Sequence, residues 1–321
     1  MWGGVEDYPR TLSEFEARFA TDEACRVYLS QLRWPEGFVC PRCGGRESWR
    51  MNRGLWLCRQ CRCQVSVTAG TVFQSAHLPL TLWFRAMWYV TSQKNGASAL
   101  GIQRILGLGS YETAWTWLHK LRRAMIRPGR ERLGGLVEVD ETYLGGLEEG
   151  RPGRPSPGKK ALIAIAAEEV GRGIGRVRLR RIRDASAASL GPFVQDAVET
   201  GSQVRTDGWV GYDGLAAMGY RHKVSIIARS KKRADQLLPH VHRVASLRKR
   251  WLLGTHQGAV SHDHLDYYLD EFTFRFNRRT SRSRGKLFYR LVQQAVQVAP
   301  QPYSAIVEKA NRKSSLPIVD S

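Results

Sequence analysis

Long hydrophobic runs are missing from this sequence of 321 residues. A membrane-spanning helix needs about 20 predominantly apolar residues in succession, and no stretch of the chain comes near that length. The opening residues, with Glu6 and Asp7 and no apolar run before Pro9, also lack the pattern of a secretory signal. We therefore expect a protein of the cytoplasm that has no membrane partner.

Acidic residues are scarce as well. The chain has 29 Asp and Glu against 50 Lys and Arg, which gives a formal net charge of +21. An excess of this size favours a polyanionic partner, because phosphates neutralised by Lys and Arg release their counterions. Nucleic acid is the first partner to consider. The alternative is a basic protein with a solvated surface, since net charge says nothing about fold.

Cysteine is rare too, with six in the chain, yet five of the six lie between Cys40 and Cys63. In a reducing compartment such clustering predicts a metal site rather than disulfide bonds. Two Cys-x2-Cys pairs, separated by fourteen residues, supply the four thiolates that tetrahedral zinc requires. They are Cys40, Cys43, Cys58 and Cys61. Because four protein ligands close the site, we expect Zn²⁺ to have a structural or DNA-gripping role. Cys63 is a spare thiol whose spacing does not suit easy displacement of Cys61, although it could replace it.

The patterning divides the chain into five parts. We expect a helical segment at residues 1–36, a zinc ribbon at 37–70, a helix-turn-helix module at 77–127, an α/β domain at 134–300 and a polar tail at 301–321. In the first part, apolar residues at helical spacing between Thr11 and Leu32 predict one or two short amphipathic helices.

The expected helix-turn-helix module rests on apolar residues at helical spacing from His77 to Met125, interrupted at Gly107-Leu108-Gly109. Helix, glycine-containing turn and helix is the outline of a DNA-reading unit. In the second helix we interpret Trp115 and Leu118 as core residues. The candidate phosphate contacts that follow are Lys120, Arg122 and Arg123. Which residues face a DNA groove stays open at this stage.

The expected α/β domain alternates apolar strands with a helix. The strands are predicted at Leu136–Val139, at Ala161–Ala167, at Val177–Ile182 and up to about Thr206, with a helix from about Ala185 to Thr200. Residues 150–160, rich in Gly, Pro and basic side chains, predict a mobile basic loop between the first two strands.

Two carboxylates stand out in this domain. Strict alternation in the first strand puts Glu138 and Asp140 on one face, and Asp207 ends a later strand just before Gly208. Carboxylates on adjacent strands can bind a pair of Mg²⁺ ions, which prefer hard oxygen ligands. A helix-capping or ion-paired role for either acid is the alternative.

Three motifs behind the cysteine cluster occur in the order and spacing of a known family. They are VEVDETYLGG, TDGWVGYDGL and HRVASLRKRWLL. The chain thereby resembles bacterial insertion-sequence transposases with an N-terminal zinc ribbon, from Leu12 to about Tyr303. The resemblance implies a DDE-type catalytic domain with an RNase H-like mixed sheet and flanking helices. It also implies Asp140 and Asp207 as the two metal-binding acids, with Mg²⁺ or Mn²⁺ as the metal.

The same resemblance suggests the third residue of the site. In the family it lies about 35 positions after the second acid and seven before a lysine of the same helix. This rule selects His242 and Lys249, with His240 as a rival. Members of the family carry Glu, Asn or His at the third position. Imidazole is a softer ligand than carboxylate and carries no negative charge, so His242 departs from the plain carboxylate triad in the residue that sets metal preference.

Downstream residues extend the basic region. Residues 221–290 contain 17 Lys and Arg against 5 Asp and Glu, a surplus of 12, which favours contact with phosphates. Glu271, Arg275 and Arg278 lie on one face of a helix, as the family shows. They form either an intrahelical ion pair of small value or a clamp that directs the arginines towards DNA. The candidate DNA contacts of this region are Arg250, Arg275 and Arg278, with Glu271 in support.

The resemblance implies a transposase that cuts at the ends of a mobile element and joins the freed 3′-hydroxyl to target DNA. Its partners would be the terminal inverted repeats, the target DNA and further copies of the chain, in a bacterial cytoplasm and on the nucleoid. Two alternatives stay open: a hydrolytic nuclease that never joins strands, and a catalytically silent DNA-binding regulator. The presence of both Asp140 and Asp207 argues against the second.

Overall fold

The computed structural model describes residues 6–52, 54–127, 129–144, 160–225, 234–257 and 260–311. The chain forms two compact units, one of Met1–Pro128 with Thr280–Ser321 and one of Gly129–Arg279. Of the expected basic loop at 150–160, all residues before Lys160 lie outside the described part of the chain. The expected polar tail at 301–321 lies outside it from residue 312 onward.

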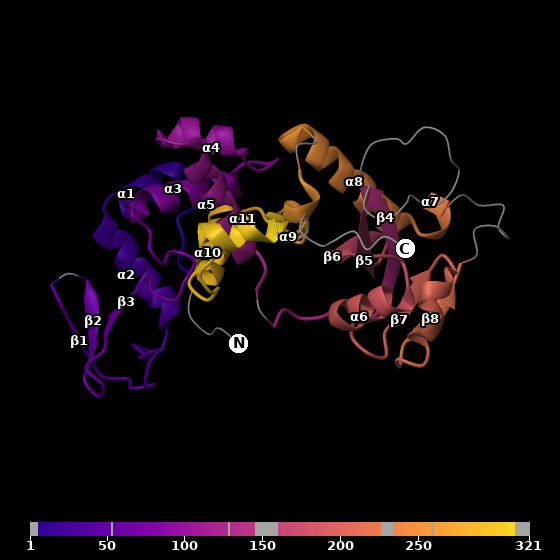
Figure 1. The fold of residues 1–321 in the computed structure, drawn as a ribbon, viewed down its shortest axis with the longest axis horizontal. Helices are drawn as coiled ribbons and strands as arrows, with labels where there is room; N and C mark the ends of the chain where they lie inside the picture. The colour runs from indigo at the N-terminus through magenta and orange to yellow at the C-terminus, as the bar shows by residue number, and fades with distance from the viewer. Residues whose placement is uncertain are drawn as a thin grey trace. The chain divides into compact units, whose positions relative to one another are not determined.

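The first unit is mainly helical (Figure 1). Its helices are α1 (Leu12–Arg18), α2 (Asp22–Arg33), α3 (Leu80–Ser92), α4 (Ala99–Leu106), α5 (Tyr111–Ala124), α10 (Arg284–Ala295) and α11 (Tyr303–Asn311). The opening segment forms two helices because Thr21 interrupts it. The hydroxyl of Thr21 accepts a hydrogen bond from the backbone N–H of Ala24 and so begins α2.

Helix α10 belongs to this first unit although it is distant in sequence. It packs against α3, and the ring of the fully buried Phe288 lies 5.3 Å from that of Phe15 and 5.7 Å from that of Phe84. The sequence pattern placed residues up to 300 in the α/β domain. The structure groups the chain from Thr280 onward with the first unit, because this aromatic cluster buries one face of α10.

Helices α4 and α5 form the expected pair with a glycine turn. Gly107 ends α4 in the left-handed region, with φ 63°, where a side chain would be strained. The hydroxyl of Ser110 accepts the backbone N–H of Thr113 and begins α5. Leu118 is buried, as a core residue should be, and Trp117 stacks on Trp83 of α3 with ring centroids 4.0 Å apart.

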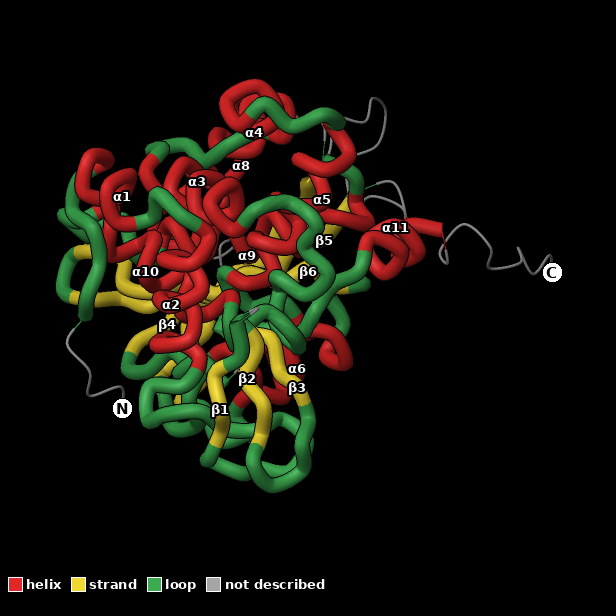
Figure 2. Tube along the Cα trace, turned by 90° about the vertical axis from the view of Figure 1, so that its left-hand side faces the viewer, coloured by secondary structure: helices red, strands yellow, loops and turns green. Residues whose placement is uncertain are grey.

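The cysteine-bearing segment folds as a three-stranded antiparallel sheet in the order β1-β2-β3, with β1 (Ser48–Arg50), β2 (Leu55–Cys58) and β3 (Gln64–Ser66). Figure 2 shows β2 between its two neighbours. Its small core combines Phe38 and Val65 with two of the cysteines, Cys40 and Cys58. So small a hydrophobic core gives little stability by itself, and a structural metal ion bound by the cysteines would supply the rest.

A five-stranded mixed sheet organises the second unit, in the order β6-β5-β4-β7-β8. The strands are β4 (Leu136–Leu144), β5 (Ala161–Val170), β6 (Gly173–Ile182), β7 (Gln203–Thr206) and β8 (Arg221–Val224). The first three are antiparallel to one another, whereas β4–β7 and β7–β8 are parallel pairs. The predicted α/β class, with a mixed sheet, flanking helices and a preceding zinc ribbon, is confirmed.

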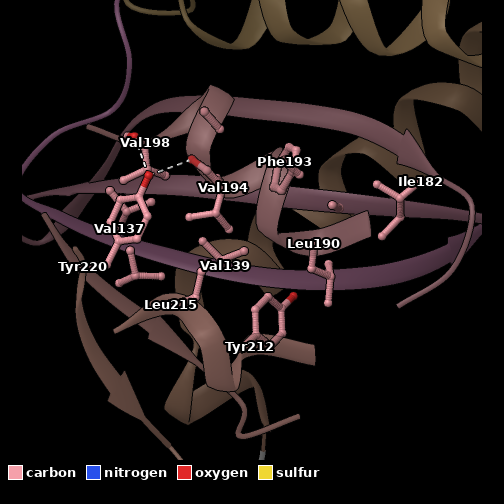
Figure 3. Close-up of a cluster of buried hydrophobic side chains, with 14 of the residues drawn as sticks. Val137, Val139, Ile182, Leu190, Phe193, Val194, Val198, Tyr212, Leu215 and Tyr220 are labelled. Carbon is pink, nitrogen blue, oxygen red and sulfur yellow. Dashed lines mark hydrogen bonds between the residues drawn. The ribbon is translucent and has the colours of Figure 1, made fainter. Parts of the chain in front are cut away.

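Helices cover both faces of this sheet (Figure 1). One face packs on α6 (Ala187–Ala197) around a core that includes Val137, Val139 and Phe193; Figure 3 shows this cluster. The other face packs on α8 (Pro239–His256) and α9 (Leu265–Phe276). Since side chains alternate along β4, Glu138 and Asp140 point to the α8 side.

Shorter elements complete the unit. They are η1 (Val210–Leu215), α7 (Ala234–Leu237) and η3 (His262–His264). Among the described residues, none of the helices has the length and apolar character to span a bilayer.

Candidate functional site

The four predicted zinc ligands come together in the ribbon. One ligand atom from each cysteine lies within 4.8 Å of all the others, with Sγ–Sγ distances of 3.6 Å for Cys40–Cys61 and for Cys43–Cys58. The Sγ of Cys63 instead contacts the backbone oxygen of the next residue, Gln64. The donor set therefore fits one tetrahedral zinc ion without Cys63.

Local hydrogen bonds also favour the thiolate form of one of these cysteines, Cys40. Burial opposes ionisation of Cys40, but backbone N–H groups of Cys43 and Arg42 stabilise its thiolate and lower its pKa to about 7. A thiolate is the form that binds zinc, so the knuckle backbone favours the ligating state.

The register of the sheet sets the two predicted acids side by side. β4 pairs with β7 in parallel, and Glu138 lies opposite Arg205. Continued by two residues, this register puts Asp140 level with Asp207, which follows the last residue of β7. Neighbouring strands are about 4.8 Å apart, so this continuation brings the two acids near each other, and the charge of Asp207 is one of the causes that raise the pKa of Asp140.

Helix α8 brings His242 to this site. Its Nε2 lies 3.8 Å from Oδ2 of Asp140, which is too long for a hydrogen bond. The same nitrogen is buried and has no hydrogen-bond partner among the residues that the structure describes. Burial, the charge of Glu141 and the charge of Asp207 together raise the pKa of Asp140 to about 8. A cation between His242 and Asp140 would give the Nε2 of His242 a partner and would favour the ionised form of Asp140.

The geometry suits metal ions of the magnesium kind. With metal–ligand distances of about 2.1 Å, two ligands of one ion are separated by roughly 3 to 4 Å, which matches the 3.8 Å between His242 and Asp140. Asp207 does not join them in a group within 4.8 Å among the described residues; its Oδ1 accepts the backbone N–H of Trp209 at 3.0 Å. A two-ion site spreads its ligands more widely, because the ions lie about 3.5–4 Å apart.

A second cluster next to this site was missed in the sequence. Glu138 is fully buried, and its carboxylate contacts Arg205 and His240. Glu138, Glu169 and His240 could by spacing hold a metal ion. However, a guanidinium nitrogen of Arg205 already lies 3.0 Å from Glu138 and 2.7 Å from Glu169. We therefore interpret the cluster as an ion network whose cation is Arg205.

This cluster also accounts for His240, the rival third ligand. Its Nδ1 lies 2.9 Å from Oε1 of Glu138, so the side chain is directed into the network. His242 is the histidine that faces Asp140. The sequence signal for the network was the acid at position 138, which shares a strand face with Asp140.

The remaining candidate residues are basic or support basic residues. On α8, Lys249 and Arg250 are exposed, and Lys249 lies two helical turns after His242, on the same side of the helix. On α9, Glu271 is buried and accepts a hydrogen bond of 2.8 Å from Nε of Arg275. Arg278, just beyond α9, stacks over the ring of Phe274 at 4.1 Å.

The three basic residues of α5 differ in exposure. Arg123 is exposed and Lys120 is half-buried, while Arg122 is only 2% exposed. Burial lowers the pKa of Lys120. A phosphate can therefore reach Arg123 most easily and Arg122 least.

Comparison with known proteins agrees with this architecture. Residues 132–277 match the model of the ISXO2-like transposase domain, and residues 20–64 match that of the transposase zinc-ribbon domain. The mixed sheet with flanking helices, behind a four-cysteine ribbon, agrees with an RNase H-like transposase architecture. The chain is also 27% identical, over 84% of its length, to an uncharacterized protein in the transposable element ISH50 of Halobacterium salinarum, and covers 94% of that protein.

The chain thus carries a transposase zinc-ribbon domain followed by an ISXO2-like transposase domain, and these two domains indicate an insertion-sequence transposase.

Proposed function

We propose that this transposase binds the ends of its element and catalyses strand cleavage there, followed by transfer of the freed 3′-hydroxyl into target DNA. The observation that supports the proposal is the approach of His242 to Asp140, together with a β4–β7 register that, continued by two residues beyond Glu138 and Arg205, leads to Asp140 and Asp207. These three side chains would hold the catalytic metal, Mg²⁺ or Mn²⁺.

Each ligand has a distinct part in this proposal. Asp140 would give up its proton on binding metal, since its raised pKa keeps it largely protonated at neutral pH. His242 would bind through Nε2, the ring nitrogen for which the described part of the chain offers no hydrogen-bond partner. When bound, a pair of such ions activates the attacking oxygen and stabilises the leaving oxygen of a phosphodiester exchange.

Exposed basic residues would hold the DNA. Lys249 and Arg250 extend from the metal site along α8 and would bind phosphates next to the scissile bond. Glu271 would keep Arg275 in one orientation through their hydrogen bond, and Arg278 would add a further phosphate contact. In the first unit, Arg123 and Lys120 would contact DNA, whereas the buried Arg122 is the weakest candidate of the three.

The transposase family also suggests the assembly, the location and the DNA recognition of this protein. Joining two element ends to a target requires several DNA segments in one complex, so we infer that the active form is a multimer on paired ends. The high net charge of +21 favours residence on the nucleoid of the cell. The ribbon and the α4–α5 pair would recognise the terminal repeats.

Strand cleavage and joining on DNA that carries the terminal inverted repeat, with Mg²⁺ or Mn²⁺, tests this proposal. We expect joined products from the wild type and none from Asp140→Ala or Asp207→Ala. Asp213→Ala, which removes an exposed acid in η1, is the matched control and should keep activity. Cleavage without joining would indicate a hydrolytic nuclease. Binding without cleavage in any metal would refute the enzymatic claim and favour a silent regulator.

A further inference from the structure

The ion network beside the candidate site is carried by the same three elements as the proposed metal ligands. Its members Glu138, Arg205 and His240 lie on β4, β7 and α8. Each is two residues before one of the three proposed metal ligands, which are Asp140, Asp207 and His242 in the same order. Contacts within the network therefore connect β4, β7 and α8. Two residues further along each element stands the side chain proposed to bind metal.

We propose that this network is a three-way clamp that positions the metal ligands, with Glu138 at its centre. The proposal rests on the metal site of the proposed function and adds the residues that set its geometry. These are positioning residues, because none of them needs to touch metal or DNA. From here on, the clamp means Glu138, Glu169, Arg205 and His240.

The contacts of Glu138 show why it can act as the centre. Its Oε2 accepts the backbone N–H groups of His240 and Val241, at 2.7 and 3.0 Å. Its Oε1 accepts Nη2 of Arg205 at 3.0 Å and lies 2.9 Å from Nδ1 of His240. These four contacts occupy the acceptor positions of the carboxylate, so Glu138 has no oxygen left for a metal ion.

The two backbone contacts fix the start of α8. Pro239 is the first residue of this helix, and the amides of the next two residues point at Glu138. A carboxylate at a helix N-terminus is favoured by the helix dipole and by unpaired N–H groups. The N-cap residue itself, Leu238, has an apolar side chain that accepts no hydrogen bond from these N–H groups. Glu138 therefore anchors α8 on β4 half a turn before His242.

Arg205 performs the equivalent task for β7. Its Nη2 contacts both Glu138 and Glu169 and so ties β7 to β4 and β5. The next residue but one is Asp207, at the end of a strand that is only four residues long. A short strand has few ladder hydrogen bonds to hold its register, so the side-chain tie limits where Asp207 can lie.

Metal affinity separates positioning from simple stabilisation. The experiment is a Mn²⁺ titration of the full-length, zinc-loaded chain by electron paramagnetic resonance, with thermal unfolding measured on the same samples. The variants are Arg205→Lys, which keeps the charge but loses the shared contact, and His240→Ala. Supporting residues of metal ligands typically contribute 10- to 100-fold to metal affinity, and we expect losses of that order in both variants.

Arg176→Lys is the matched control. Arg176 also forms a charged contact with an acid of β5, Glu168, at 2.8 Å, but that pair precedes no proposed ligand. We expect this variant to lose stability while its Mn²⁺ affinity stays at the wild-type value. Glu138→Gln should weaken Mn²⁺ binding more than either single clamp variant. If it fails to fold, the Arg205 and His240 variants still decide the question.

Three outcomes would overturn the clamp. One is an Arg205→Lys variant that loses stability as the control does but binds Mn²⁺ normally. The second is an ion that persists in Asp140→Ala and disappears in Glu138→Gln, because the cluster would then be the binding site itself. The third is wild-type affinity in His240→Ala. Failure of the wild type to bind Mn²⁺ at all would instead refute the proposed function from which the clamp starts.

Discussion

At the scale of single residues, the protonation of Asp140 is the main electrostatic feature of the candidate site. An ordinary aspartate has a pKa near 3.9, whereas burial and two neighbouring acids raise the pKa of Asp140 to about 8. The folded protein therefore holds this proton at neutral pH. The stabilisation from the proton is fully present below the ordinary pKa of about 4 and declines as the pH rises from there to about 8, unless a cation replaces the proton.

This shift predicts that metal binding releases a proton. Below pH 8 the Mg²⁺ affinity should rise by about tenfold per pH unit and then level off, because one proton must leave Asp140. Calorimetric titration at pH 7 in buffers of different ionisation enthalpy measures the release, which should be close to one proton per site. An affinity that is constant between pH 6 and pH 8 would show that Asp140 is not a ligand.

His242 gives a second prediction at this scale. His242→Ala should lose cleavage, since it removes the group that faces Asp140 at 3.8 Å. His242→Glu should keep activity and shift the preference towards Mg²⁺, because carboxylate is a harder ligand than imidazole. Cleavage rates over a range of Mg²⁺ and Mn²⁺ concentrations measure both effects. Normal activity in the alanine variant would remove His242 from the site.

At the scale of elements, the ribbon depends on four of its five cysteines. Cys58→Ser removes a fully buried ligand and should abolish zinc binding and unfold the ribbon, because small metal-bound domains depend on their metal for folding. The zinc content measured by atomic absorption should fall from about one per chain to near zero. Mn²⁺ binding by the second unit should persist, since that unit has its own core.

Cys63→Ser is the control for this prediction. The Sγ of Cys63 lies against the oxygen of Gln64 rather than among the ligands, so this variant should retain its zinc. Loss of zinc in Cys63→Ser but not in Cys58→Ser would mean that the spare thiol is a ligand.

Much of the element structure could be predicted from the sequence. The apolar periodicity of the helical segments indicated α3, α4 and α5, and Gly107 marked the turn. The first strand was expected to end at Val139, yet β4 continues to Leu144. Its last residues are held by antiparallel pairing with β5, up to Leu144 opposite Ala161, and a polar stretch such as Glu141-Thr142 gives no apolar alternation to reveal this.

Less of the candidate site than of the element structure could be predicted from the sequence. The resemblance selected Asp140, Asp207 and His242, but only the β4–β7 pairing, which ends at Glu138 opposite Arg205, showed that the strands leading to the two acids are neighbours. The role of Glu138 depends on contacts with residues 67 and about 100 positions away, and single-sequence patterns carry no such pairing. The return of α10 to the first unit is a long-range effect of the same kind.

At the scale of the whole molecule, charge should govern how strongly the protein binds DNA. Each phosphate contact that is removed should reduce the slope of log affinity against log salt by about 0.9. Lys249→Gln and Arg250→Gln should each have this effect and should weaken binding to all sequences alike. Fluorescence anisotropy with labelled duplexes over a range of salt concentrations measures the slope.

Arg172→Gln is the control for charge alone. Arg172 is exposed on the turn between β5 and β6, so its loss changes the net charge by the same amount without touching α8. If all three variants had the same slope as the wild type, α8 would not be a phosphate-binding surface.

Exchange of the two aspartates for cysteine tests most directly whether both bind metal during the reaction. Thiolate is a soft ligand that Mg²⁺ binds poorly and Mn²⁺ accepts more readily. In cleavage assays on inverted-repeat DNA, Asp140→Cys and Asp207→Cys should be inactive with Mg²⁺ and regain activity with Mn²⁺, whereas the alanine variants should stay inactive with both. Cysteine variants that are equally active, or equally inactive, with the two metals would contradict an Asp140–Asp207 metal centre.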